Sequence, residues 1–276
     1  MKEIVSRFTF GFLMAQLVPG AVALAFITLV FTARDVGQGA SLSRAVQLSA
    51  EGWLGAHCCV PDGVTASAGT AARPGLGVAK IAAFLVLAIA VGMLIHGVNW
   101  MVLAWLENHQ GSLCTTRVRT SFWHRARLFV QLVLAPLKMV LEVLWILKAP
   151  GIVLLAMDEN APEITTKDRE GMFVFIQDFY LYFFQFYSHT AYALLCGIPC
   201  LALAHRSLHH SVQQALPSLV GLYLLTSLFF LIGRVQYTSM CMAEFKFLCK
   251  SVTPVTPPRP EGLWEKLWWW LWQGPA

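Results

Sequence analysis

The stretch IAAFLVLAIAVGMLIHGVNWMVLAWL, residues 81–106, contains no Asp, Glu, Lys or Arg. A helix needs about 20 apolar residues to cross a hydrocarbon core about 30 Å thick. This stretch meets that length without any charged side chain to bury. We therefore expect residues 81–106 to cross a membrane.

Three other apolar stretches are long enough to do the same: residues 8–31, 179–204 and 216–233. The whole chain of 276 residues is 57% apolar and 13% charged, whereas soluble proteins average about 25% charged residues. The sequence predicts an all-α membrane protein, a four-helix transmembrane bundle in which residues 1–250 form a single polytopic domain. Four crossings leave no room for a large soluble domain.

The first span follows Lys2 and Arg7, as a signal peptide would. Its apolar run is longer than the roughly 7 to 15 residues of a signal h-region, and no small-x-small cleavage site comes before Arg34. We expect it to be retained as the first crossing. Pro19 and Gly20 interrupt its middle, and such a break survives in lipid where neighbouring helices satisfy the freed backbone groups.

The distribution of basic residues predicts the orientation. Two of the 20 Lys and Arg residues precede the first span, eight lie between the second and third, and five follow the fourth. By the positive-inside rule this side is cytoplasmic, so both termini are inside and the loop of residues 32–79 is extracytoplasmic. The net charge of +5 then faces anionic lipid headgroups and implies no nucleic-acid partner. Composition and short loops suggest a bacterial inner membrane.

The cytoplasmic connection contains a further apolar region, residues 121–157, which Pro136 and Pro150 divide into pieces too short to span. Its polar residues recur near helical spacing: Arg127, Gln131, Lys138 and Glu142. This pattern predicts an interfacial or re-entrant amphipathic hairpin. Two additional crossings are the alternative, and they would bury Lys138 and Glu142 at a cost of several kcal/mol.

The C-terminal residues 251–276 begin with a proline-rich linker, which cannot continue a helix, and end in the Trp-rich sequence LWEKLWWWLW. Trp prefers the headgroup level of a membrane. We expect a Trp-rich helix that lies in the interface.

One span carries a polar stripe among its aromatic residues. Its members fall at i, i+4, i+7 and i+11: Asp178, Tyr182, Gln185 and His189. A stripe of this kind is costly in lipid, so it should face the bundle interior. Asp178 and Arg234 both lie near the cytoplasmic ends of their spans, and we expect them to form an ion pair.

His96 and Asn99 lie in the second span at a depth comparable to that of His189. Two interpretations stay open. These residues and Gln185 could form an interhelical hydrogen-bond network. Alternatively, His96 and His189 could ligate a haem b, with Gly92 and Gly97 making room for the macrocycle.

Four cysteines are expected on the extracytoplasmic side: Cys58, Cys59, Cys196 and Cys200. They could form disulfides, act in thiol redox chemistry or remain reduced. In outline the arrangement resembles that of quinone-linked disulfide-generating membrane enzymes, but no C-x-x-C is present. His57, His205 and His209 could join the first two cysteines in a metal site, although interfacial histidines usually bind none, and we predict no metal.

No P-loop, dinucleotide fingerprint or nucleophile elbow occurs in the chain. The leading hypothesis is a non-enzymatic multipass inner-membrane protein without a cofactor, an oligomeric bundle that acts as a channel, a membrane effector or a subunit of a membrane complex. Its partners would be the lipid bilayer and either copies of itself or other membrane subunits. The alternative is an electron-transfer or thiol-redox protein that uses haem b or the outer cysteines.

The orientation is testable by labelling with a membrane-impermeant thiol reagent in intact cells. In variants that keep a single cysteine and carry Ser at the others, Cys58 should react and Cys249 should stay protected, because only the former faces outward. Reaction of Cys249 with protection of Cys58 would show the inverted orientation.

Overall fold

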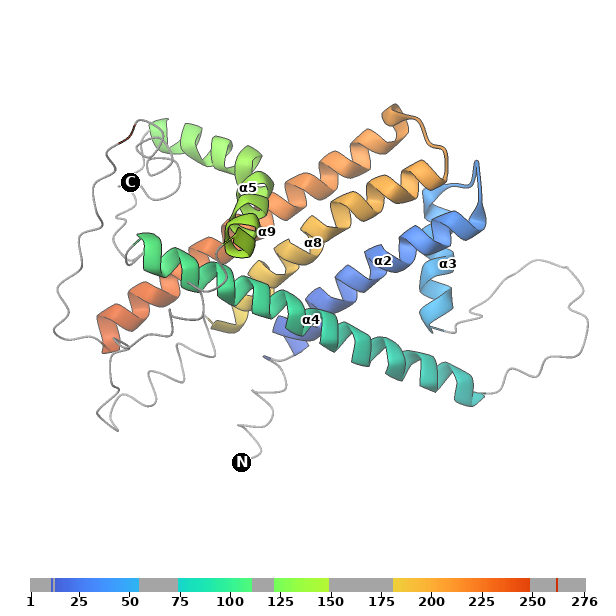
Figure 1. The fold of residues 1–276 in the computed structure, drawn as a ribbon, viewed down its shortest axis with the longest axis horizontal. Coiled ribbons are helices and arrows are strands. Elements are labelled where there is room, and N and C mark those ends of the chain that lie inside the picture. Colours follow the sequence, from blue (N-terminus) through green and yellow to red (C-terminus); the bar gives the residue numbers. More distant parts are fainter. Residues whose placement is uncertain are drawn as a thin grey trace, which may run out of the picture.

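The computed structural model describes residues 11, 13–54, 74–110, 122–148, 181–248 and 262. Within these ranges the chain forms helices and no strands (Figure 1). The elements are the π-helix η1 (Leu13–Leu17) and the α-helices α2 (Val18–Val36), α3 (Leu42–Leu54), α4 (Pro74–Gln110), α5 (Phe122–Lys148), α8 (Tyr182–Ser207) and α9 (Val212–Leu248).

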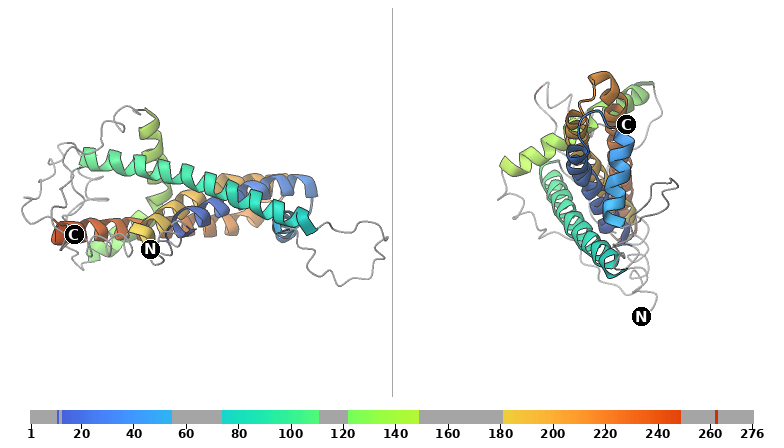
Figure 2. Two further views of the ribbon diagram at one scale, coloured as in Figure 1. Left: turned by 90° about the horizontal axis from the view of Figure 1, so that it is seen from below. Right: turned by 90° about the vertical axis from the view of Figure 1, so that its right-hand side faces the viewer.

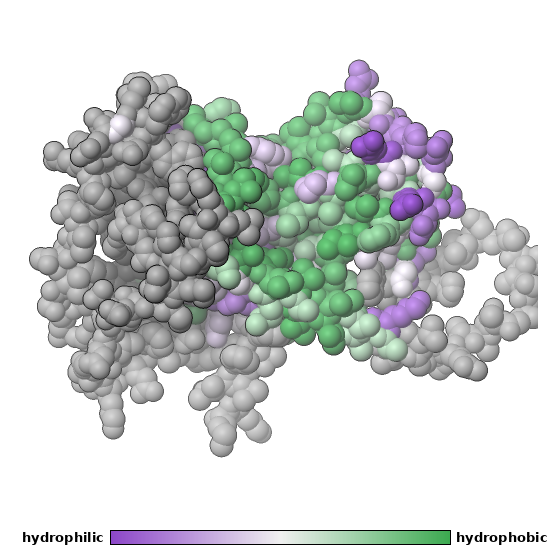
Figure 3. Space-filling model, in the orientation of Figure 1, coloured by the Kyte–Doolittle hydropathy of each residue, from purple (hydrophilic) through white to green (hydrophobic). Residues whose placement is uncertain are grey.

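Four helical segments are long and apolar enough to cross a membrane: Leu13–Val36, Ala79–Val102, Tyr182–Ser207 and Val212–Tyr237. They overlap the four predicted spans. The prediction of an all-helical protein with four segments able to span a membrane is therefore confirmed for the described residues. α2, α8 and α9 lie side by side, and α4 crosses α2 at an angle. The surface over the middle of these helices is hydrophobic, and hydrophilic residues gather at the end where α2 and α8 terminate (Figure 3).

Glycine allows the first span, made of η1 and α2, to approach α4 closely. A Cβ atom on Gly20 would lie 1.8 Å from the Ala88 carbonyl oxygen, and one on Gly92 would lie 2.0 Å from the carbonyl oxygen of Gln16. Neither position can hold a larger residue without moving the backbone. Close backbone contact at small residues is a common way to pack helices in a membrane.

The break predicted at Pro19 and Gly20 takes the form of a π-helical turn. η1 ends at Leu17 and α2 continues at once from Val18, with Pro19 in its first turn. Proline is tolerated there because the first N–H groups of a helix have no partner within the helix. The first span therefore remains one continuous helical segment.

α5 differs from the expectation in one way. It continues through Pro136 as a single helix, so the predicted interruption there is wrong. The last part of the expected hairpin, residues 149–157, lies outside the described residues. It also runs across the long axis of the other helices (Figure 2). Lys138 and Glu142 are 6% and 3% exposed, because this face packs against α9. The interfacial or re-entrant placement of this helix in the membrane stays a prediction.

α3 is a helix that the sequence analysis did not predict. It begins after Ser41, whose hydroxyl oxygen accepts a hydrogen bond from the Arg44 backbone N–H at 3.3 Å. This is the arrangement of a helix N-cap. α3 folds back beside α2, where Ser49 bonds Thr28. The linker and the Trp-rich helix predicted for residues 251–276 lie outside the described residues except for Gly262, and they stay predictions.

The close approach of α4 to the first span can be tested with a matched pair of substitutions. Gly92→Ala should destabilise the protein by about 1 to 3 kcal/mol, the usual cost of overpacking. Gly97→Ala on the same helix should be neutral or stabilising, because a Cβ there meets no atom within 4 Å and alanine favours helices. Unfolding in a denaturing detergent measures both. Equal effects would contradict the packing described.

Candidate functional site

The interior polar cluster centres on His189, which is fully buried on α8. Its Nδ1 lies 2.5 Å from the Ala15 carbonyl oxygen of η1. Its Nε2 lies 3.4 Å from His96 Nδ1 on α4, and the two rings stand perpendicular with centroids 5.0 Å apart. One side chain thus joins three segments that are distant in the sequence.

Pro19 removes one possible donor to the Ala15 carbonyl. In an α-helix this carbonyl would accept the N–H of the residue four positions later, which is Pro19 and has no N–H. In the π-helical pattern of η1 the corresponding donor is five positions later, at Gly20, and His189 adds a donor from another helix at this break in the backbone pattern. The sequence predicted a break at Pro19 and an inward-facing polar stripe that includes His189. It did not predict that His189 contacts the backbone beside Pro19.

The contact also determines which ring nitrogen carries the proton. A carbonyl oxygen only accepts hydrogen bonds, so His189 Nδ1 must be the donor. In a neutral ring Nε2 is then an acceptor, and the His96 Nδ1–H donates to it. The hydrogen bonds run from α4 through α8 to η1.

Asn99 forms a second link between α4 and α8. The Ser188 hydroxyl donates to Asn99 Oδ1 at 2.7 Å, and both side chains are buried. Ser188 was missed because serine is common in apolar helices and gave no separate signal. Of the other stripe residues, Gln185 is buried and Tyr182 is half-buried, while Asp178 lies outside the described residues.

The arrangement does not fit a haem between His96 and His189. The two rings are in direct contact, so a macrocycle cannot lie between them. Gly92, one of the two glycines expected to make room, packs against the Gln16 backbone instead. His96 also presents Nδ1 to this contact, whereas bis-histidine haem ligation normally uses Nε2 of both rings.

A buried ion cluster joins α5 to α9. Arg234 Nη2 lies 2.8 Å from Glu142 Oε2, and Lys138 Nζ contacts the other carboxylate oxygen. Phe230 covers both cations, with its ring centroid 4.9 Å from Arg234 Cζ and 5.7 Å from Lys138 Nζ. One carboxylate therefore serves two cations beside an aromatic face, which offsets part of the cost of burying them.

The two cations determine the protonation of Glu142. Burial alone raises the pKa of this carboxyl, but the charges and hydrogen bonds of Arg234 and Lys138 outweigh burial, so its pKa lies below the ordinary value of 4.5. Burial lowers the pKa of Lys138; Arg234 adds to this effect and Glu142 opposes it. Glu142 is consequently an anion at neutral pH.

Arg234 was expected to pair with Asp178, which lies outside the described residues, so that contact stays a prediction. Among the described residues, Arg234 contacts the carboxylate of Glu142. The position of Glu142 on the polar face of residues 121–157 was recognised in the sequence. Its pairing with Arg234 was not predicted, because Arg234 was expected to pair with Asp178.

The outer cysteines and histidines show no redox or metal geometry in the described part of the chain. Cys196 is exposed, Cys200 is half-buried, and neither is in a disulfide; Cys58, Cys59 and His57 lie outside it. Of the histidines named for a possible metal site, His205 contacts His210. Nδ1 of His205 lies 2.8 Å from His210 Nδ1, and His209 turns to the Ser207 carbonyl.

The His205 and His210 pair instead ties the ends of three helices together. His205 Nε2 lies 2.8 Å from Ser218 Oγ on α9, and His210 Nε2 lies 3.0 Å from the Ala40 carbonyl oxygen between α2 and α3. No group of three His, Cys, Asp or Glu side chains suited to a metal occurs among the residues with described positions.

Comparison of the chain with family models, curated proteins and solved structures gave no match. The function has to be argued from the contacts themselves.

The ion cluster predicts strong coupling between α5 and α9. Glu142→Gln and Arg234→Gln should each destabilise by about 3 to 5 kcal/mol, because each leaves a buried charge without its main partner. The double variant should recover part of this loss, and additive losses would show that the residues do not interact. A parallel cycle with Asp178→Asn tests the predicted second acid.

The same cluster predicts a pH dependence of stability. Because the folded-state pKa of Glu142 is below its ordinary 4.5, its contribution is complete above about pH 4.5 and is lost as the pH falls through the lowered pKa. Glu142→Gln should remove this acid sensitivity in thermal unfolding experiments. An unchanged acid profile in the variant would contradict the assignment.

Proposed function

We propose that this chain is a non-enzymatic multipass protein of the bacterial inner membrane, with both termini cytoplasmic, that serves as a structural subunit and assembles with further copies of itself. The observation that carries the proposal is that three groups of buried polar side chains bind one another across helices. The contacts of His189, Asn99 and Glu142 each join two or three helical segments.

Among the roles of channel, effector and subunit, these contacts favour the subunit. Polar side chains that line a conducting path must exchange partners with water or ions. Here Ser188 donates directly to Asn99 and His96 donates directly to His189. Interhelical hydrogen bonds of this type hold membrane helices in one register.

The surface of α4 supports assembly. This helix attaches to the rest of the bundle along one narrow stripe of buried residues: Ala88, Gly92, Ile95, Asn99 and Val102. Much of the rest of its described surface is exposed and apolar, and Val86 and Leu94 are 66% and 72% exposed. A helix that is apolar all round is suited to lipid or to another helix.

Small residues lie on this free surface at intervals of seven: Ala83, Ala90 and Gly97, none of which is buried. A seven-residue repeat keeps one face of a helix toward a partner helix. Small residues let the two backbones approach, which is the main source of packing energy between helices in lipid. A second copy of α4 presents the same row and fits it by symmetry.

The assembly is tested by Gly97→Leu with Gly221→Leu as its matched control. Neither glycine has an atom within 4 Å of a Cβ built on it, so both variants should fold as single chains. Gly97→Leu should convert the oligomer to a smaller species in light scattering of detergent-purified protein, because its side chain blocks the close approach. Gly221→Leu on α9 should leave the oligomer intact.

A wild-type protein that is monomeric, or an oligomer that survives Gly97→Leu, would contradict assembly through this face. Conductance in vesicles of the wild-type protein, lost in a folded His189→Leu variant, would favour the channel role instead.

A further inference from the structure

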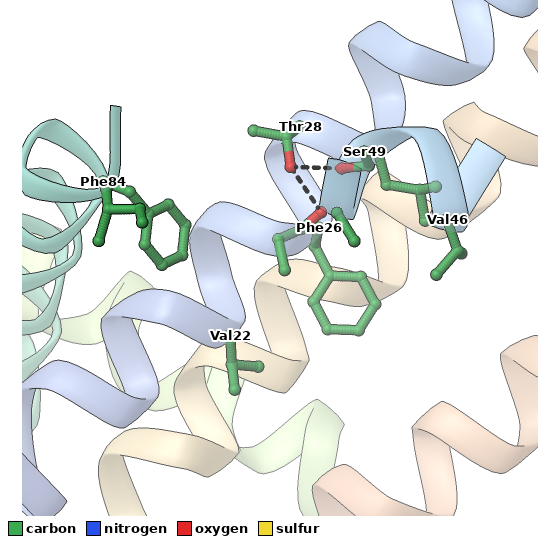
Figure 4. Close-up of a pocket in the computed structure, with 10 residues that line it drawn as sticks. Val22, Phe26, Thr28, Val46, Ser49 and Phe84 are labelled. Carbon is green, nitrogen blue, oxygen red and sulfur yellow. Dashed lines mark hydrogen bonds between the residues drawn. The ribbon is translucent and has the colours of Figure 1, made fainter. Parts of the chain in front are cut away.

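A cavity of about 430 Å³ lies between α2, α3 and α4 (Figure 4). Each helix contributes apolar side chains to its wall: Val22 and Phe26 from α2, Val46 and Ala50 from α3, and Ile81 and Phe84 from α4. Pockets of this size are large enough to hold a small ligand. These six side chains are apolar and belong to none of the polar clusters that hold the helices together.

The cavity exists because α2 and α4 separate. They are in backbone contact where Gly20 meets Ala88, and beyond that point they diverge toward the end of α2 (Figure 1). α3 folds back and closes one side, held by contacts with both α2 and α4. The cavity is the space that the three helices leave between them.

The two hydroxyl groups in the wall satisfy each other. Thr28 donates to the Ala25 carbonyl at 3.1 Å, so in its 2.9 Å contact with Ser49 the Ser49 hydroxyl is the donor. Both hydroxyl protons are used within the protein. The occupant of this cavity therefore meets a hydrocarbon wall with no free donor, which suits a hydrocarbon chain.

The depth of the cavity indicates where such a chain comes from. The α2 residues that line it belong to the span Leu13–Val36, from its middle toward its end, and Ile81 and Phe84 lie near the start of the span Ala79–Val102. These two ends lie on the same side of the membrane. The cavity thus occupies one leaflet, which is the outer one in the proposed orientation.

Charge at the rim indicates the headgroup. Lys80 is exposed, adjacent to Ile81 and one helical turn before Phe84 on α4, so it reaches the headgroup level of the same leaflet. At this end of the bundle Arg34 is next to Asp35, and Arg44 shares α3 with Glu51. The charges of these four cancel. Lys80, together with Arg206 in the last turn of α8, leaves a net positive charge among the described residues of this end, which favours an anionic lipid.

We propose that this cavity binds one acyl chain of an anionic phospholipid, whose phosphate lies beside Lys80. The inference depends on the membrane placement of the four spans and not on self-assembly. Bound lipid would fill the gap between α2 and α4 and hold α3 against them. The protein would then carry a structural lipid at this site.

The test is native mass spectrometry of full-length protein taken from vesicles of equal parts phosphatidylglycerol and phosphatidylethanolamine. The wild type should retain one phospholipid per chain, mainly phosphatidylglycerol. Ala50→Phe fills the cavity and should lower retention about tenfold or more, since loss of two buried methylenes suffices for that factor. Ala82→Phe, on the opposite side of α4 at the same depth, should retain lipid as the wild type does.

Lys80→Gln should keep the bound lipid but lose the preference for phosphatidylglycerol. If Ala50→Phe does not fold, judged by circular dichroism, Ala25→Phe fills the cavity from the opposite wall and replaces it. Equal retention in the cavity-filled and Ala82→Phe variants would overturn the site. Retention of free fatty acid in place of phospholipid, or a wild type without headgroup preference, would overturn the proposed ligand.

Discussion

The hydrogen bond from His189 to the Ala15 carbonyl is the contact on which the arrangement of the bundle depends. Pro19 cannot donate to that carbonyl in the α-helical pattern, and His189 of the third span supplies a donor from another helix. The contact holds the third span against the first, and His96 of the second span completes the ring pair. Helix register follows from this contact, because a shift of one residue would leave the imidazole without its partners.

The ion cluster fixes the position of α5 because its buried charges need partners on α9. Glu142 cannot stay charged in an apolar interior without Arg234 and Lys138, and neither cation can be buried alone. Together they make it possible for a helix with charged residues to pack against α9 within the depth of the fourth span. The glycine contacts of α2 and α4 and the histidine pair at the far end complete the bundle. The buried polar side chains of these clusters thus hold helices together, which is why the subunit role is the one proposed.

The sequence predicted the spans because crossing a membrane depends only on length and apolar content, and both can be read directly. It did not predict α3 or the burial of α5. α3 is short, and its start depends on a single cap, Ser41. The burial of Lys138 and Glu142 depends on Arg234, which lies more than ninety positions away. Pairing over such distances is invisible to periodicity. In the interior polar cluster, helical spacing predicted the polar stripe of the third span. It could not predict that Ser188 bonds Asn99 or that His189 bonds the Ala15 carbonyl.

Nitrogen-15 NMR of the imidazole groups tests the central contact most directly, because it reports which ring nitrogen carries the proton. The His189 signals are assigned by their loss in His189→Gln. The contact with Ala15 requires a protonated Nδ1 and, in the neutral ring, an unprotonated Nε2 that accepts from His96. A neutral His189 with its proton on Nε2 would contradict the account, because Nδ1 would then have no hydrogen to give to the carbonyl.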